Sequence, residues 1–211
     1  MKIFFPLFVS LLIAGCSNQG NHSNNSVAAD TPAKRSTSPV RRITPNPYAM
    51  IDVSPMDMAY FPVDFPIAKM SKTAEGQPLA RVIYSRPHRQ GRKIFGDLLK
   101  YGEPWRLGAN EATELELFKD VIIQNKRINK GRYILYCIPQ ANSWTIVFNS
   151  NLYTWGLKPN PQKDLYKFQI PVQHSDISIE FFTMVFEPAS AGANLLMAWD
   201  DVVARLPITF K

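Results

Sequence analysis

A basic segment carries the strongest chemical signal in the chain. Its five cationic residues surround His88 with no acidic residue before Asp97: Arg81, Arg86, Arg89, Arg92 and Lys93. Arginine offers paired donors to carboxylates, phosphates or sulfates, an indole ring offers a flat face to a sugar, and amide and carboxyl groups orient hydroxyls. We therefore predict a ligand site within residues 84–113, with the candidate binding residues Arg86, His88, Arg92, Trp105, Arg106, Asn110 and Glu111.

The same charges also permit a purely structural role. An arginine among residues 86, 92 and 106 that pairs with Glu111, Glu114 or Glu116 would hold a long loop against the domain, because ordered loops need partners for their polar groups. Experiments must therefore separate a binding pocket from a structural ion pair.

An enzymatic role rests on Glu111, which we consider as the catalytic carboxylate of a hydrolase acting on saccharides or esters. The chain has no Gly-rich phosphate loop and no G-x-S-x-G sequence, and the proximity of Ser85, His88 and Glu111 supplies neither an aligned base nor an oxyanion hole. We lean toward a binding protein and keep the hydrolase as the alternative.

Metal and cofactor chemistry have little support in the sequence. The only histidines are His22, His88 and His174. A zinc site would need carboxylates such as Glu111 or Asp176, at spacings that no motif specifies. The chain also lacks C-x-x-C and H-E-x-x-H sequences. We expect neither a metal nor a cofactor.

Residues 1–15 have the pattern of a lipoprotein signal peptide. Lys2 precedes an 11-residue apolar run that ends in Ile13-Ala14-Gly15-Cys16, and a membrane-spanning helix needs about 20 residues. Lipid attachment at Cys16 would anchor the mature chain to a lipid bilayer through two or three acyl chains. The alternative is an ordinary signal peptide in which Cys16 occurs by chance.

Residues 16–50 read as the lipidated cysteine followed by a disordered tether. They are rich in Ser, Thr, Asn, Gln and Pro and contain few large apolar residues, so they cannot bury enough surface to fold. Ser17 follows Cys16 where inner-membrane retention signals place an acidic residue. We therefore expect a periplasm-facing position at the outer membrane of a bacterial envelope.

Nucleic acid is an improbable partner. The 24 Lys and Arg residues against 17 Asp and Glu residues give a net charge of +7. Much of this excess lies before residue 51, at Lys34, Arg35, Arg41 and Arg42. The remaining chain is nearly balanced, whereas nucleic-acid binders concentrate basic charge on the folded domain.

Residues 51–211 read as one all-β domain that must position the candidate site. Short apolar or alternating runs are separated by Pro, Asn and Gly turns; they are 81–85, 114–118, 121–124, 132–138, 144–149, 165–172, 178–187, 195–200 and 202–210. Nine such runs predict an antiparallel β-sandwich of jelly-roll or Greek-key type. Weak helical spacing allows one short helix near 93–101, and the Pro-rich segment 51–78 reads as an extended arm.

Several short motifs in this domain resemble the bacterial domain-of-unknown-function family 2911. They are Tyr84-Ser-Arg-Pro87, Gly91 to Gly96, Trp105-Arg106, Gly108-Ala-Asn-Glu-Ala-Thr113, Gly131-Arg-Tyr133, Trp144 to Phe148 and Trp155-Gly156. The resemblance implies an exported, β-rich domain and supplies no mechanism. We therefore predict a membrane-tethered lipoprotein that recognises a glycan, an anionic ligand or a partner protein of the envelope.

Overall fold

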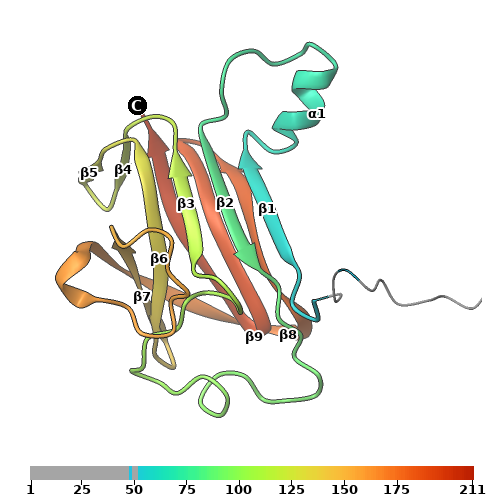
Figure 1. Ribbon diagram of the computed structural model, residues 1–211, viewed down its shortest axis with the longest axis vertical. Helices are drawn as coiled ribbons and strands as arrows, with labels where there is room; N and C mark the ends of the chain where they lie inside the picture. Colours follow the sequence, from blue (N-terminus) through green and yellow to red (C-terminus); the bar gives the residue numbers. More distant parts are fainter. Residues whose placement is uncertain (1–47, 49–51) are drawn as a thin grey trace, which may run out of the picture. The chain divides into compact units, whose positions relative to one another are not determined.

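The computed structural model describes Tyr48 and residues 52–211. The predicted signal peptide, Cys16 and, apart from Tyr48, the tether lie outside the described residues. The described part contains nine strands, one short helix and one 3-10 turn (Figure 1): β1 Met56–Phe61, α1 Phe65–Met70, β2 Ala80–Ser85, β3 Thr113–Leu117, β4 Val121–Ile123, β5 Lys126–Ile128, β6 Gly131–Pro139, β7 Ser143–Asn149, η1 Pro161–Lys163, β8 Asp164–Ala189 and β9 Gly192–Phe210. No helix among these residues is long and apolar enough to cross a membrane.

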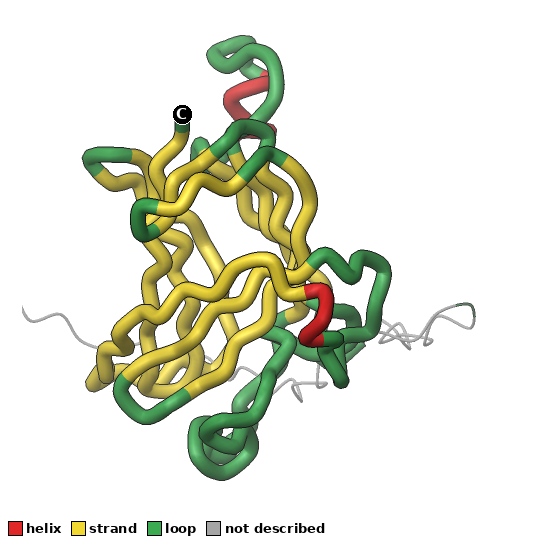
Figure 2. The backbone as a smooth tube through the Cα atoms, turned by 90° about the vertical axis from the view of Figure 1, so that its left-hand side faces the viewer, coloured by secondary structure: helices red, strands yellow, loops and turns green. Residues whose placement is uncertain are grey.

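The strands form one antiparallel sheet in the order β1-β2-β3-β6-β7-β8-β9-β4-β5. The predicted single antiparallel all-β domain is thus confirmed, and its layers belong to one continuous sheet that is not closed. The sheet can fold over itself because β8 and β9 are long and bent (Figure 2). The bends occur where the β8–β9 register shifts, between His174 and Thr183 opposite Asp200. Bulges of this kind increase local twist.

The bends explain why nine predicted runs do not map one to one onto nine strands. The runs 165–172 and 178–187 belong to the single strand β8, and the runs 195–200 and 202–210 belong to β9. The bulged positions interrupt the alternation of apolar and polar residues without ending the strand.

Aromatic side chains fill the space between the two layers of the sheet. Phe61 of β1 stacks on Phe210 of β9, with ring centroids 5.1 Å apart, and Tyr84 of β2 meets Phe182 of β8 edge to face at 5.8 Å. Trp144 on β7 is buried, as its alternating pattern predicted. Cys137 is fully buried in the same core. Burial raises the pKa of the Cys137 thiol well above its ordinary value, so this thiol is a core residue.

Two local predictions near the N-terminal part of the domain were wrong. Residues 93–101 form turns rather than a helix, because Gly96 has φ +89° and Ile94 and Phe95 both point into the core. The helix lies instead at α1, directly after β1. The Pro-rich segment is not only an extended arm, since Met56–Phe61 pairs with β2 as the edge strand of the sheet.

The loop of residues 86–112 closes one end of the sheet, below β2 and β9 in Figure 1. It is pinned to β8 by the Arg89 N–H, which donates to the carbonyl of Glu180 at 2.7 Å. It is pinned to β6 by Trp105 and Cys137, whose backbone groups exchange two hydrogen bonds of 2.7 Å. These bonds satisfy the loop backbone and hold its side chains in fixed positions.

Candidate functional site

A cavity with a volume of about 530 Å³ lies under this loop. Ligand sites for small molecules typically span about 300–1,000 Å³. We call it the basic cavity, and its lining comprises Val53, Ser54, Pro87, His88, Gln90, Arg92, Leu98, Leu99, Lys100, Glu103, Pro104, Trp105, Arg106, Gly108, Ala109, Gly156, Leu157 and Trp199.

Two stacked indoles belong to the apolar part of this lining. Trp105 and Trp199 have ring centroids 5.8 Å apart and an interplanar angle of 24°. Each indole N–H is already used inside the protein: Trp105 donates to the carbonyl of Gly108 and Trp199 to the carbonyl of Glu180. The rings therefore offer the cavity their apolar surface and no free donor.

The charged part of the lining is dominated by cations. Arg92, Lys100 and Arg106 face the cavity, and within residues 52–211 none of the three forms an ion pair with a carboxylate. Glu103 is the single carboxylate of the lining. Such an excess of unpaired cations in a concave site attracts anions.

The two arginines among these cations are positioned by neutral groups. Arg92 donates from Nε to the carbonyl of Arg89 at 2.8 Å and from Nη2 to the carbonyl of His88 at 2.5 Å. Arg106 is half-buried, and burial lowers the pKa of its guanidinium. Its Nη1 donates to the carbonyl of Trp155, whose ring centroid lies 5.8 Å from Cζ. Both guanidinium groups are held in place while their charge stays free.

Asp200 fixes the loop that forms the cavity. This side chain is 9% exposed, and its Oδ1 lies 2.8 Å from Nε of Arg89. Its carboxylate also accepts the N–H of Ile94 at 3.2 Å and the hydroxyl of Ser178 at 3.1 Å. One carboxylate at the β9 bulge thus ties the loop and β8 together.

The stretch Gly108 to Thr113 is explained mostly by close backbone packing. A Cβ on Gly108 would lie 2.9 Å from the carbonyl oxygen of Ser85. Asn110 has φ +57° and donates to Asp52 at 2.5 Å, which holds the segment before β1 against the loop. A Cβ on Gly156 would lie 2.7 Å from Cβ of Ala112, so the two loops meet where only small residues fit.

The structure brings four of the seven predicted binding residues to the basic cavity: His88, Arg92, Trp105 and Arg106. The other three lie elsewhere. Arg86 pairs with Asp57 at 3.1 Å, Asn110 binds Asp52, and Glu111 is exposed and makes no hydrogen bond or ion pair in the described chain. Arg106 and Glu111 therefore do not form the structural ion pair that the sequence allowed.

Sequence reasoning missed part of the lining. Lys100 and Trp199 were not among the predicted binding residues, and Gly156 with Leu157 come from a separate loop. The Trp155-Gly156 motif was the one sequence signal that pointed to this second loop. Contacts between distant loops leave no local pattern, so the sequence alone could not place them at the cavity.

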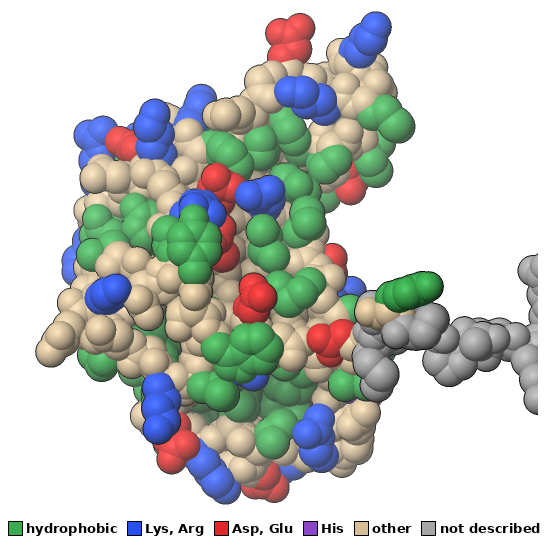
Figure 3. Space-filling model, in the orientation of Figure 1, with side chains coloured by type: hydrophobic (Ala, Val, Ile, Leu, Met, Phe, Trp, Pro, Cys, Tyr) green, Lys and Arg blue, Asp and Glu red, His purple; other side chains and the backbone are tan. Residues whose placement is uncertain are grey.

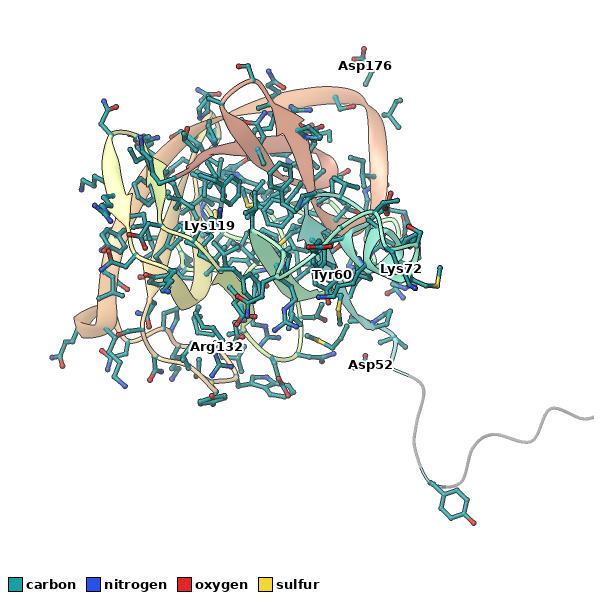
Figure 4. The ribbon with its side chains drawn as sticks, turned by 90° about the horizontal axis from the view of Figure 1, so that it is seen from above. Asp52, Tyr60, Lys72, Lys119, Arg132 and Asp176 are labelled. Atoms are coloured by element: carbon teal, nitrogen blue, oxygen red, sulfur yellow. The ribbon has the colours of Figure 1, made fainter. Side chains whose placement is uncertain are left out.

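No metal centre is formed by the part of the chain that the structure describes, because no three His, Cys, Asp or Glu residues are grouped to hold an ion. Asp176, which the sequence offered as a zinc ligand, projects from the bend of β8 on the side opposite Asp52 (Figure 4). Asp52 is the partner of Asn110, beside Glu111, so the two suggested carboxylates are not brought together.

Comparison with known proteins assigns the chain to a protein family. No curated protein and no solved structure matches the chain. The model of the family described as "Protein of unknown function (DUF2911)" matches residues 66–208, a range that covers the cavity-forming loop and β2 to β8 in full. Because this match spans well over half of the sequence, the chain belongs to the DUF2911 family, as its short motifs predicted.

Proposed function

We propose that this protein is a lipid-anchored module of a bacterial cell envelope whose folded domain binds an anionic ligand in the basic cavity. The observation that carries the proposal is that Arg92, Lys100 and Arg106 line one cavity and that none of them has a carboxylate partner among residues 52–211. Cations without carboxylate partners give a concave site a positive potential. An anionic ligand would be attracted to that potential.

Binding is favoured over hydrolysis by the position of the carboxylates. Glu111, the candidate catalytic residue, does not line the cavity. Glu103 lines it alone, whereas glycoside hydrolysis commonly uses two facing carboxyl groups. The lining therefore supports recognition of a ligand.

The binding proposal can be tested by thermal unfolding of the full chain in detergent with a panel of small anions. Phosphate, glucose 6-phosphate and glucuronate are compared with neutral glucose. We expect at least one anion to raise Tm by mass action on the folded state, and we expect added salt to weaken the effect. A variant with Arg92→Gln, Lys100→Gln and Arg106→Gln should lose the response.

The matched control carries Lys119→Gln and Lys126→Gln. Both lysines are exposed. Lys119 lies between β3 and β4 and Lys126 begins β5, and the β4–β5 hairpin lies at the end of the sheet that is opposite the loop (Figure 1). This control should respond like the unmodified chain. Absence of any response to all three anions, or an equal response in the cavity variant, would contradict the proposal.

The anchor has its own test. The apolar run that ends in Ile13-Ala14-Gly15-Cys16 predicts that Cys16→Ala releases the protein from membranes. Fractionation with detergent phase partitioning measures this release. A Cys16→Ala product that stays membrane-bound and lipid-labelled would overturn the lipoprotein part of the proposal.

A further inference from the structure

The loop between β7 and η1 exposes two aromatic side chains. Tyr153 is 82% exposed and Trp155 is 53% exposed. Each ring lies against an arginine: Cζ of Arg132 is 5.2 Å from the Tyr153 centroid, and Cζ of Arg106 is 5.8 Å from the Trp155 centroid. Figure 3 shows large hydrophobic side chains with Lys and Arg beside them on this face. The two rings are thus supported from behind and open to solvent.

These rings continue directly from the basic cavity. Arg106 both lines the cavity and contacts the Trp155 ring, and Gly156 and Leu157 belong to the lining as well. Tyr153 precedes Trp155 by two residues, so their Cα atoms are at most about 7 Å apart. A ligand that extends from the cavity past Arg106 would reach the Trp155 ring, which lies against Arg106, and Tyr153 is close to Trp155 in the same loop.

The loop holds the rings in a fixed arrangement. The carbonyl of Thr154, between the two rings, accepts the N–H of Ala112 at 3.3 Å, and the Ser150 N–H donates to the carbonyl of Lys163 at 2.9 Å. Tyr153 has φ +59°, a conformation that bulky residues rarely adopt. Its ring gains little burial there, so core packing does not account for this arrangement.

The surroundings favour a sugar chain over a peptide as the occupant. Arg132, beneath Tyr153, belongs to β6, which is paired with β3 on one side and β7 on the other, so β6 has no free edge beside Tyr153 for an extended peptide. Flat, rigid rings match the apolar C–H faces of sugars. The unpaired cations of the cavity select sugars that carry an acidic group.

We propose that the site recognises an acidic oligosaccharide, with one acidic sugar in the basic cavity and the following sugars stacked on Trp155 and Tyr153. This inference rests on the proposed function, because it assumes that the cavity binds an anion. It adds the class of ligand and two outer contact residues.

The test compares the affinities of galacturonic acid, its dimer and its tetramer for the full chain by isothermal titration calorimetry, with neutral maltotetraose as the uncharged probe. We expect the tetramer to bind about tenfold or more tightly than the monomer, a difference of about 1.4 kcal/mol. Tyr153→Asn should reduce tetramer affinity and leave monomer affinity nearly unchanged. Trp155→Ala should reduce tetramer affinity by a larger factor than monomer affinity, because the Trp155 ring also lies against Arg106 of the cavity. Asn suits position 153 because it tolerates positive φ.

Tyr60→Ala is the matched control. Tyr60 is a half-buried aromatic residue on the edge strand β1, away from Arg132 (Figure 4), and its loss should leave both affinities unchanged. Equal binding of monomer and tetramer, or tetramer binding that survives both loop substitutions, overturns this inference while the anion site stands. If none of the galacturonic acid probes binds, this inference is overturned. If the small anions of the thermal-unfolding test also fail to bind, the proposed function is overturned as well.

Discussion

Arg106 lies over the ring of Trp155, with 5.8 Å from Cζ to the ring centroid, and does not pair with Glu111 five residues further along the chain. The charge of Arg106 is thereby left available at the wall of the basic cavity. This contact distinguishes a binding role from a structural ion pair. The two roles predict different losses of unfolding free energy when either charge is removed.

The effects of removing the Arg106 and Glu111 charges on the free energy of unfolding should therefore be independent of each other. We expect Arg106→Gln and Glu111→Gln each to cost less than about 1 kcal/mol of unfolding free energy, with a coupling below about 0.5 kcal/mol in the double variant. Denaturant unfolding followed by tryptophan fluorescence measures both quantities. A coupling of several kcal/mol would show that the two side chains form a structural ion pair after all.

Replacement of Asp200 should loosen the cavity loop. Asp200→Ala removes the partner of Arg89 and the acceptor of the Ile94 N–H, and a buried pair broken in this way costs about 3 kcal/mol or more. Asp200→Asn keeps an acceptor and tolerates the φ of +53° at this position, so it should cost clearly less. Hydrogen exchange of residues 86–112 should rise in the Ala variant, and unchanged protection there would contradict the anchoring role.

Gly156→Ala tests the contact between the two loops. Its new Cβ would lie 2.7 Å from Cβ of Ala112, and Gly156 also has φ +79°. The control Gly76→Ala has a similar φ of +72° but nothing within 4 Å of the new Cβ. The positive φ should reduce the stability of both variants by about 1–2 kcal/mol. Gly156→Ala should lose about 1–3 kcal/mol more stability because the new Cβ overpacks the contact. Equal losses in thermal unfolding would show that the loops do not meet tightly.

Asp164 should make the protein sensitive to acid. Burial by itself raises the pKa of this carboxyl, and the hydrogen bonds from Asn149, Lys167 and Tyr136 outweigh burial, so the pKa lies below its ordinary value. A lowered pKa in the folded state stabilises the fold above the ordinary carboxyl pKa of about 4, and this stabilisation is lost as the pH falls through the lower folded value.

The matching variant is Asp164→Asn. It should be less stable than the unmodified chain by about 1–3 kcal/mol at neutral pH, and the difference should shrink as the pH falls below about 4. Asp176→Asn, at an exposed carboxyl without a hydrogen bond in the described chain, serves as the control. A destabilisation by Asp164→Asn that is independent of pH would exclude this linkage.

Local patterns predicted the strands well and the cavity in part. β2, β3, β6 and β7 agree with the apolar or alternating runs within one or two residues, because buried apolar side chains mark each of these strands. The continuity of β8 and β9 was missed, since their bulges break the alternation. Arg86 was assigned to the site, yet its partner Asp57 is brought to it by the pairing of β1 with β2. Partners that strand pairing brings together cannot be read from residue spacing within one segment.

The most direct test of the anion site is hydrogen exchange of the full chain with and without a saturating acidic ligand, read peptide by peptide by mass spectrometry. We expect protection of peptides that cover residues 88–106 and 150–157, because Arg92, Lys100, Arg106 and the Trp155 loop surround the cavity. Peptides of β4 and β5 should not change, since this hairpin lies at the other end of the sheet. Protection confined to other segments, or none in the loop of residues 86–112 at saturation, would contradict the assignment of the basic cavity as the binding site.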